Sequence, residues 1–174
     1  MRRDTGVLVV FTAKSVQQIL DLGGTQSWVL NERSMRDVQY VVCTRNSDPA
    51  YDEECGVRTE RHNAAFLVGK VSGLSKIDHR NGRDRYRVNI AEYALVDVPG
   101  FRHGSVRNPV TYSDVGQCKQ NGIDLENLNF EVVEKSIEKK STVQKRGFSI
   151  PEAKEGLSAY FGVPLESVQI TISA

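Results

Sequence analysis

Long apolar segments are missing from this sequence. No apolar run approaches the roughly 20 residues that a helix needs to span a bilayer. The first apolar run, residues 6–11, is short and rich in valine, so it is typical of a β-strand and not of a signal peptide. We therefore expect no membrane among the partners of this protein.

Cysteine is also scarce. The three cysteines, Cys43, Cys55 and Cys118, are odd in number and widely spaced, which argues against a disulfide framework and favours a reducing, cytoplasmic location. Cys43 follows strand-forming residues, so we expect it in the core, where burial raises the pKa of a thiol and makes it a poor nucleophile. We expect Cys55 and Cys118 in polar loops.

The signature motifs of three common enzyme classes are absent. The chain has no phosphate-binding Gly-x-x-x-x-Gly-Lys-Ser/Thr loop, no dinucleotide-binding Gly-x-Gly-x-x-Gly and no Gly-x-Ser-x-Gly elbow. The histidines, His62, His79 and His103, have neither a histidine four residues away nor a Cys-x-x-Cys neighbour. The sequence therefore predicts no catalytic residue, no metal and no cofactor. A hydrolase or nuclease built from loops is left as a third interpretation.

The residues that are present fit one globular domain with an appendage. Hydrophobic residues make up 39% and charged residues 26% of the 174 residues, which are ordinary values for a folded protein. The run at 6–11 predicts a strand that is central in a sheet and covered on both faces. Ser15, three residues before Gln18, predicts a capped helix that ends at Gly23-Gly24. Further strands are predicted at 27–30 and 38–44, with edge strands at 110–112 and 130–133.

A long hairpin is the clearest element. Residues 66–74 are strand-like, and Asn81-Gly82 is a dipeptide that accepts positive φ at both central positions of a type I′ turn. Beyond the turn, apolar and polar side chains alternate, which predicts one buried and one solvent-exposed face. The apolar set is Tyr86, Val88, Ile90, Ala94, Val96 and Val98, and the polar set is Arg85, Arg87, Asn89 and Asp97. Glu92 breaks the alternation, so we expect a bulge or a bend there.

Charge is distributed unevenly, although the formal net charge is only +1. Residues 47–55 carry four acids and no base, whereas residues 56–112 carry ten Lys/Arg against five Asp/Glu. This excess of basic residues is typical of a patch that contacts phosphates, but a solvated sheet face produces the same count. Both interpretations stay open at this point.

The chain beyond residue 135 has a different organisation. Apolar residues become rare over 136–147, which predicts a linker between a main domain at 1–135 and an appendage at 148–174. In the appendage, Ser149, Pro151 and Glu152 predict a capped helix, and residues 168–172 alternate like a half-buried strand. A helix and a strand of this size need a surface to pack on, either the main domain or a second copy of the chain.

Residues at the ends of two predicted strands are candidates for binding. Trp28 is the only tryptophan, and Thr44, Arg45 and Asn46 end the strand that begins near residue 38. An indole can stack on a base, an amide can pair with a base edge and a guanidinium can contact phosphate. A core tryptophan followed by ordinary turn residues would give the same sequence.

The order of these features resembles the PUA-like superfamily, especially its ASCH and EVE branches. The resemblance covers roughly residues 6–98. It rests on the first strand, Ile19-Leu20-Asp21-Leu22-Gly23, Trp28, Tyr40-Val41-Val42-Cys43 and residues 66–71. The sequence departs from the ASCH pattern at Gly24-Thr25, where that branch has its Lys-Thr and Arg positions, and no Gly-Asp turn precedes residues 38–44.

The resemblance implies an α+β fold: a small curled β sheet or β barrel with two or three helices, followed here by the C-terminal helix-strand appendage. It also implies a non-catalytic module that reads single-stranded or modified nucleic acid, or a base-like ligand, in a pocket between residues 12–14 and the indole. The candidate ligand-binding residues are Thr12, Lys14, Ser27, Trp28, Thr44, Arg45 and Asn46. The alternative is an interaction or structural protein that forms a homodimer through its last helix and strand.

Overall fold

The computed structural model describes residues 6–51, 55, 59–103, 106–133, 151, 154–155, 157–158 and 164–170. The chain divides into two compact units, Met1–Ser136 and Ile137–Ala174, and each is considered by itself. Across the described residues, no helix has the length and apolar character that crossing a membrane would require.

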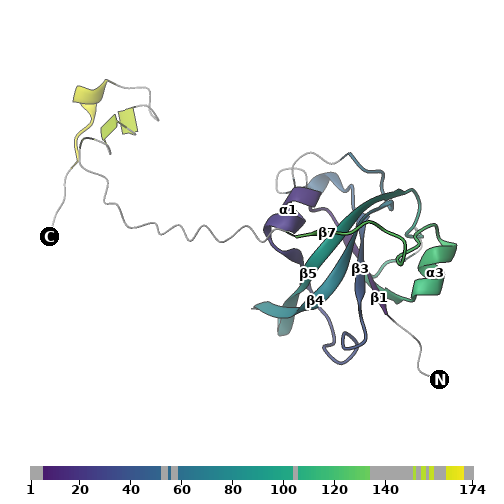
Figure 1. Ribbon diagram of the computed structural model, residues 1–174. Coiled ribbons are helices and arrows are strands. Elements are labelled where there is room, and N and C mark those ends of the chain that lie inside the picture. Colours follow the sequence, from purple (N-terminus) through teal and green to yellow (C-terminus); the bar gives the residue numbers. More distant parts are fainter. Residues whose placement is uncertain are drawn as a thin grey trace. The chain divides into compact units, whose positions relative to one another are not determined.

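The first unit is built on one mixed sheet, which in the described part of the chain has seven strands and is accompanied by two short helices (Figure 1). Its elements are β1 (Val7–Thr12), α1 (Val16–Asp21), β2 (Gly24–Trp28), β3 (Tyr40–Arg45), a 3-10 turn (Pro49–Tyr51), β4 (Ala65–Arg80), β5 (Arg83–Val98), β6 (Val110–Ser113), α3 (Val115–Gln120) and β7 (Glu131–Val132). The strand order is β2-β5-β4-β3-β1-β6, and β7 pairs with β5. This is the expected α+β class.

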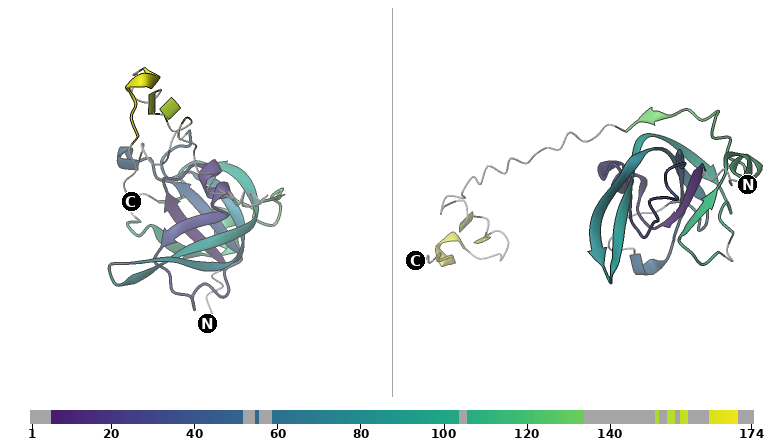
Figure 2. Two further views of the ribbon diagram at one scale, coloured as in Figure 1. Left: turned by 90° about the vertical axis from the view of Figure 1, so that its left-hand side faces the viewer. Right: turned by 90° about the horizontal axis from the view of Figure 1, so that it is seen from below.

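The sheet curls but does not close, so the barrel that the resemblance allows is not formed by the described residues. Figure 2 shows the long strands β4 and β5 bending across the shorter ones. β2 and β6 end the strand order and do not pair with each other. Two short strands share the side of β5 that faces away from β4: β2 pairs with residues 86–89, and β7 pairs only with Glu92 and Tyr93.

The central strands β1 and β3 are covered on both faces, as predicted from the run at 6–11. They run parallel, and β1 is also paired with β6, so it lies inside the sheet. Because successive side chains of a strand alternate between faces, a strand buried on both sides needs an uninterrupted apolar run. One core cluster contains Leu8, Val10, Val41 and Cys43, and the cluster on the other face contains Val7, Val9 and Val42.

The helix α1 begins and ends where its sequence predicts. The Ser15 hydroxyl accepts a hydrogen bond from the Gln18 amide at 3.2 Å, and the Gln18 side chain accepts one from the Ser15 amide at 3.0 Å. This reciprocal pair is a capping box. Gly23, at φ +67°, supplies the left-handed residue that stops the helix. Ile19 is fully buried and fixes the helix to the core.

The long hairpin is also confirmed. Asn81 and Gly82 have φ of +53° and +71°, and Arg80 pairs with Arg83 across the turn. The register places Lys70 opposite Glu92 and the next residue, Val71, opposite Ile90. One residue of β5 is therefore unpaired beside Glu92, which is the expected bulge.

Two local expectations in the first unit are wrong. The second strand covers Gly24–Trp28 and not residues 27–30, because Gly24 already pairs with Asn89 of β5. Cys118 lies in the helix α3, where it is fully buried, and Cys55 is also buried and has helical backbone, so neither lies in a polar loop. The helix starts at Asp114, whose carboxylate accepts a hydrogen bond from the Gln117 amide at 2.8 Å. The edge strands near 110 and 131 are present.

The second unit is described only in part. Pro151, Lys154, Glu155, Leu157 and Ser158 have helical backbone, in agreement with the predicted helix. Residues 165–167 form a 3-10 turn, and residues 168–170 form no strand, so the predicted strand at 168–172 is absent over its described part. The linker at 136–147, Ser149 and residues 171–172 lie outside the described residues. The dimer contact through this unit stays a prediction.

Candidate functional site

The predicted stacking residue, Trp28, lies in the packed core. Its side chain is 9% exposed and belongs to the cluster of Leu8, Val10 and Cys43. The indole N–H donates to the Thr25 hydroxyl at 3.1 Å. Burial raises the pKa of the Cys43 thiol to about 12, against the lowering effects of the Arg45 charge and of a hydrogen bond with the Thr25 side chain. The ring is therefore held by interior contacts.

The predicted phosphate-binding residue, Arg45, is fully buried. Its Nη2 lies 2.8 Å from a carboxylate oxygen of Glu60, and its Nη1 donates to the carbonyls of Ala13 at 3.0 Å and Lys14 at 2.7 Å. The guanidinium carbon lies 3.9 Å from the ring centre of Phe66. These contacts fasten the segment between β1 and α1 to the end of β3, which is a structural role.

The other predicted residues fall into two groups. Thr12, Lys14, Thr44 and Asn46 join Arg45 at the carboxyl ends of the parallel strands β1 and β3: the Thr44 hydroxyl donates to a carbonyl of β1 at 2.9 Å, and the Asn46 amide donates to the Thr12 carbonyl at 2.9 Å. Ser27 and Trp28 lie on β2, which pairs with β5 instead. The structure therefore separates the indole from the polar strand end.

Two cavities in the described part of the first unit are unsuited to a phosphate. The first, of about 310 Å³, lies between α1, β5 and β7 and is lined by Gln17, Leu20, Asp21, Tyr93, Glu131, Val132 and Val133. The second, of about 390 Å³, is lined by Thr59, Glu60, Arg61, Val96, Asp97 and Pro99. The first contains two carboxylates and no cation, which repels an anion, and in the second Arg61 is outnumbered by two carboxylates. Among the described residues, no group of three or more His, Cys, Asp or Glu side chains could hold a metal ion.

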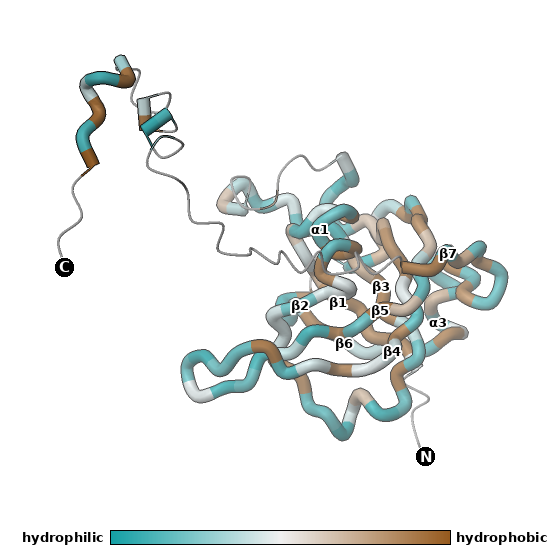
Figure 3. Tube along the Cα trace, turned by 60° about the vertical axis from the view of Figure 1, so that its left-hand side comes forward, coloured by the Kyte–Doolittle hydropathy of each residue, from teal (hydrophilic) through white to brown (hydrophobic). Residues whose placement is uncertain are grey.

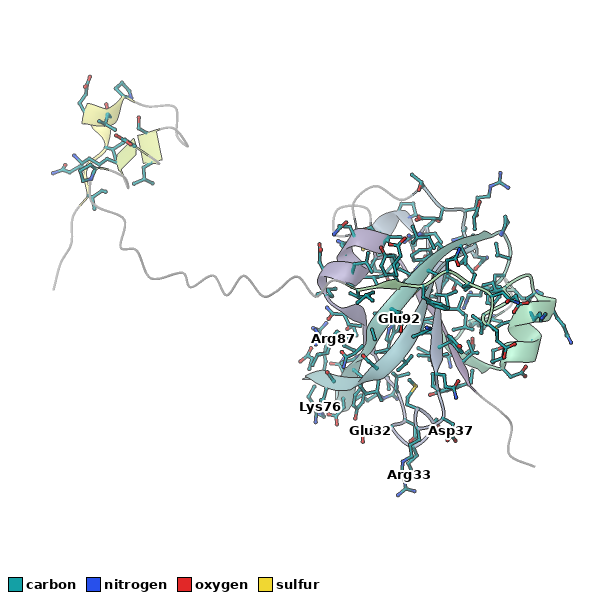
Figure 4. All side chains as sticks on the ribbon, in the orientation of Figure 1. Glu32, Arg33, Asp37, Lys76, Arg87 and Glu92 are labelled. Carbon is teal, nitrogen blue, oxygen red and sulfur yellow. The ribbon has the colours of Figure 1, made fainter. Side chains whose placement is uncertain are left out.

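Unbalanced positive charge is found on the solvent-facing side of β5. Arg83, Arg85 and Arg87 share one side of this strand, which we call the arginine face, while Tyr86 and Val88 point into the core. Figure 4 labels Arg87 and Lys76 on this hairpin. None of the three arginines has an ion pair with a carboxylate in the described chain.

Neutral groups hold two of these guanidiniums. Arg85 Nη1 donates to the Ser27 carbonyl at 3.2 Å, and Arg87 Nε donates to the Asn89 side chain at 2.9 Å. The Asn89 amide in turn donates to the Ser75 hydroxyl at 2.9 Å. A guanidinium has five N–H donors, so these contacts orient the side chains without neutralising them.

The acidic residues of the hairpin pair with cations other than these three arginines. Asp84 points to the opposite side, where Lys76 lies 2.8 Å away and His79 also contacts it. Hydrogen bonds from Lys76 and His79 hold the pKa of Asp84 below its usual value. Asp78 lies opposite Arg85, on the side of the arginine face, and its carboxylate pairs with Arg80 at 3.0 Å. Charge is therefore balanced on one side of the hairpin and left positive on the other.

Comparison with known proteins gives no relative. No family model, no curated protein and no solved structure matches this chain. The PUA-like resemblance therefore stays a prediction.

The arginine face could be predicted from the sequence. The alternation after Asn81-Gly82 already assigns Arg85 and Arg87 to one side and Asp84 to the other. Whether a residue has an odd or an even position along the strand thus indicates which charges could neutralise one another. Trp28 is the stronger candidate from the sequence because an indole is a good stacking group. The sequence contains no pattern that predicts the burial of this ring.

Proposed function

We propose that this protein is a nucleic-acid-binding module that contacts phosphates through the arginine face of the β4–β5 hairpin. The observation that supports this proposal is the set of three guanidiniums on one side of β5, exposed Arg83 and half-buried Arg85 and Arg87, that have no carboxylate partner among the described residues. Arginine matches phosphate geometry and is more weakly hydrated than lysine, which favours this ligand.

The spacing of the arginines suits a polyanion. Alternate residues of a strand repeat at about 6.6 Å, so the three guanidiniums form a straight row roughly 13 Å long. A row of fixed cations releases the counterions that surround a nucleic acid, and the affinity then falls with salt. Three phosphate contacts predict a slope of log K against log salt of about −2.7 for a duplex.

Base recognition by Trp28, Arg45 and Asn46 stays a separate prediction. The indole is covered, the guanidinium is engaged with Glu60, and the Asn46 side-chain oxygen accepts a hydrogen bond from the Asp48 amide at 3.0 Å. The phosphate proposal does not depend on these residues.

The test is a binding titration at two salt concentrations. A fluorescent oligonucleotide is titrated with wild-type protein and with R83Q/R85Q/R87Q, and anisotropy gives Kd. We expect the affinity of the wild-type protein to fall about 40-fold between 50 and 200 mM salt. We expect the triple variant to lose most of its affinity and most of its salt dependence.

A matched control removes the same charge elsewhere. The variant R61Q/R107Q/K119Q also loses three positive charges, from exposed positions outside the hairpin. Arg61 precedes the first residue of β4, whereas the turn of the hairpin follows its last residue. The proposal fails if the control loses as much affinity as R83Q/R85Q/R87Q, or if the wild-type protein binds no nucleic acid at low salt.

A further inference from the structure

The shape of the hairpin points to one class of nucleic acid. Resting on the proposed function, we infer that the partner is double-stranded DNA in the B form and that the β4–β5 ribbon enters its major groove. The ribbon is defined here as residues 76–87, the part of the hairpin that surrounds the Asn81-Gly82 turn. Three observations support this inference.

The tip of the ribbon stands free of the other strands: residues 77–85 pair only within the hairpin, whereas Tyr86 and Arg87 also pair with β2. Residues 76–80 are all exposed, in contrast to the buried start of β4 at residues 65–69. Figure 3 shows a hydrophilic loop of two antiparallel segments that projects beyond the rest of the first unit. Four residues of β4 beyond the last one opposite β2 give a reach of about 13 Å, which exceeds the depth of the major groove of roughly 8.5 Å.

The width of the ribbon matches the major groove. Two paired strands lie about 4.8 Å apart, and a two-stranded ribbon with its side chains is admitted by the major groove of B-form DNA, which is about 12 Å wide. The minor groove, about 6 Å wide, is too narrow for it. The major groove of A-form RNA is deep and narrow, so duplex RNA is excluded on the same ground.

The ribbon offers no aromatic ring beside its arginines on which single-stranded bases could stack. Tyr86 is 8% exposed, lies on the side away from the arginines and donates its hydroxyl hydrogen to Glu32 at 2.8 Å. The ring of His79 lies opposite Asp84, also on the side away from the arginines, and contacts that carboxylate. Proteins that bind single strands rely on aromatic stacking in addition to charge. A guanidinium row without an aromatic ring beside it favours a duplex, whose bases remain stacked on one another.

Side chains of the ribbon also suit the floor of the major groove. Arginine donates to the O6 and N7 acceptors of guanine, and an apolar side chain can contact the methyl group of thymine. Ile77 is the apolar residue exposed on the ribbon, at 38%, and it lies among Lys76, Asp78 and His79. Ile77 belongs to neither core cluster of the described residues.

The experiment compares three nucleic acids that share one nucleotide sequence. Anisotropy is measured at 50 mM salt with a DNA duplex, the matching RNA duplex and the matching single DNA strand. We expect the DNA duplex to bind at least about tenfold more tightly than the other two, which corresponds to the loss of one good groove contact. The variant R83Q/R85Q/R87Q should bind all three equally weakly.

Two further DNA duplexes test whether the ribbon enters the major groove. A duplex with a glucosyl group attached at C5 of its cytosines has its major groove filled, and we expect its affinity to fall at least about tenfold. A duplex whose minor groove is occupied by netropsin should bind as the free duplex does.

The outcomes separate this inference from the proposed function. Equal, arginine-dependent binding of all three ligands would leave the phosphate-binding function in place and overturn the duplex inference. A preference for the DNA duplex that survives glucosylation would overturn the major-groove position. Binding of no nucleic acid would refute both.

Discussion

Replacement of Arg45 by methionine tests the structural role that we assign to this residue. The substitution keeps much of the volume but removes the guanidinium, so the carbonyls of Ala13 and Lys14 lose the donor that lies 3.0 and 2.7 Å away. Each buried acceptor left without a partner costs about 1 to 3 kcal/mol. Glu60 is 23% exposed and can be hydrated, so it adds little. We expect a loss of about 4 kcal/mol in the free energy of unfolding, from a total of about 5 to 15 kcal/mol.

The measurement is urea denaturation followed by the fluorescence of Trp28, the only tryptophan and a core residue of the first unit. The matched control is Arg36→Met at an exposed position, which should change the stability by no more than about 0.5 kcal/mol. A loss below about 1 kcal/mol for Arg45→Met would refute the reasoning.

A second substitution covers the case in which Arg45→Met does not fold. Glu60→Gln keeps an oxygen acceptor for the guanidinium but removes the negative charge that lies 2.8 Å from it. We expect a loss of about 1 to 2 kcal/mol, since hydrogen bonds to charged groups are worth more than neutral ones. Unchanged stability in Glu60→Gln would show that the ion pair contributes nothing.

Three further predictions concern other parts of the first unit. Gly24→Ala would place a methyl carbon 2.1 Å from a backbone carbonyl oxygen of β5, so thermal unfolding should show a loss of at least about 3 kcal/mol, whereas Gly82→Ala meets no atom within 4 Å and should cost about 1 to 2 kcal/mol for its left-handed backbone alone. The Cys43 thiol, with a pKa raised to about 12, should fail to react with a thiol reagent at pH 8 until the protein is unfolded; reaction in the folded state would contradict its burial. Lys76→Met should raise the pKa of Asp84 in an NMR titration, because the hydrogen bond from Lys76 is the largest cause of its lowering. The pKa of Asp84 is lower in the folded protein than its ordinary value of 3.8. The ionised Asp84 carboxylate therefore stabilises the fold above pH 3.8, and this stabilisation is lost as the pH falls through the pKa of the folded state.

Much of the fold follows from local sequence patterns. The apolar run at 6–11, the Ser15–Gln18 capping box and the Asn81-Gly82 turn each specify a structure through neighbours within a few residues. The alternation after the turn also determines which face of β5 is wet. These elements were predictable because the interactions that decide them are short in sequence.

The sequence-based predictions that were wrong depend on contacts between distant segments of the chain. Closure of a barrel would require pairing of the edge strands β2 and β6, and no local pattern reports that β6 has only four residues. The start of β2 was misplaced because Gly24, read as a helix stop, also pairs with Asn89. Pairing across 65 positions in the chain leaves no signature in the nearby sequence.

The candidate site shows the same division. Arg45 is buried by the segment between β1 and α1, and Trp28 by core residues of β1 and β3, and the local sequence does not record either contact. The arginine face, in contrast, lies within one hairpin, so its charge pattern could be derived from position parity and the turn alone. The sites that are easiest to predict are those assembled from a single local element.

The place of β1 in the sheet has a consequence for biosynthesis. β1 is translated before both of its neighbours, β3 and β6, and the second of these ends at Ser113, roughly 100 residues later. At a translation rate of about 5 to 20 residues per second, this interval lasts roughly 5 to 20 s. For that time the nascent chain carries an apolar segment with an open edge, which is prone to aggregate. The yield of folded protein should therefore depend on temperature and chaperone supply during synthesis more than on the stability of the finished sheet.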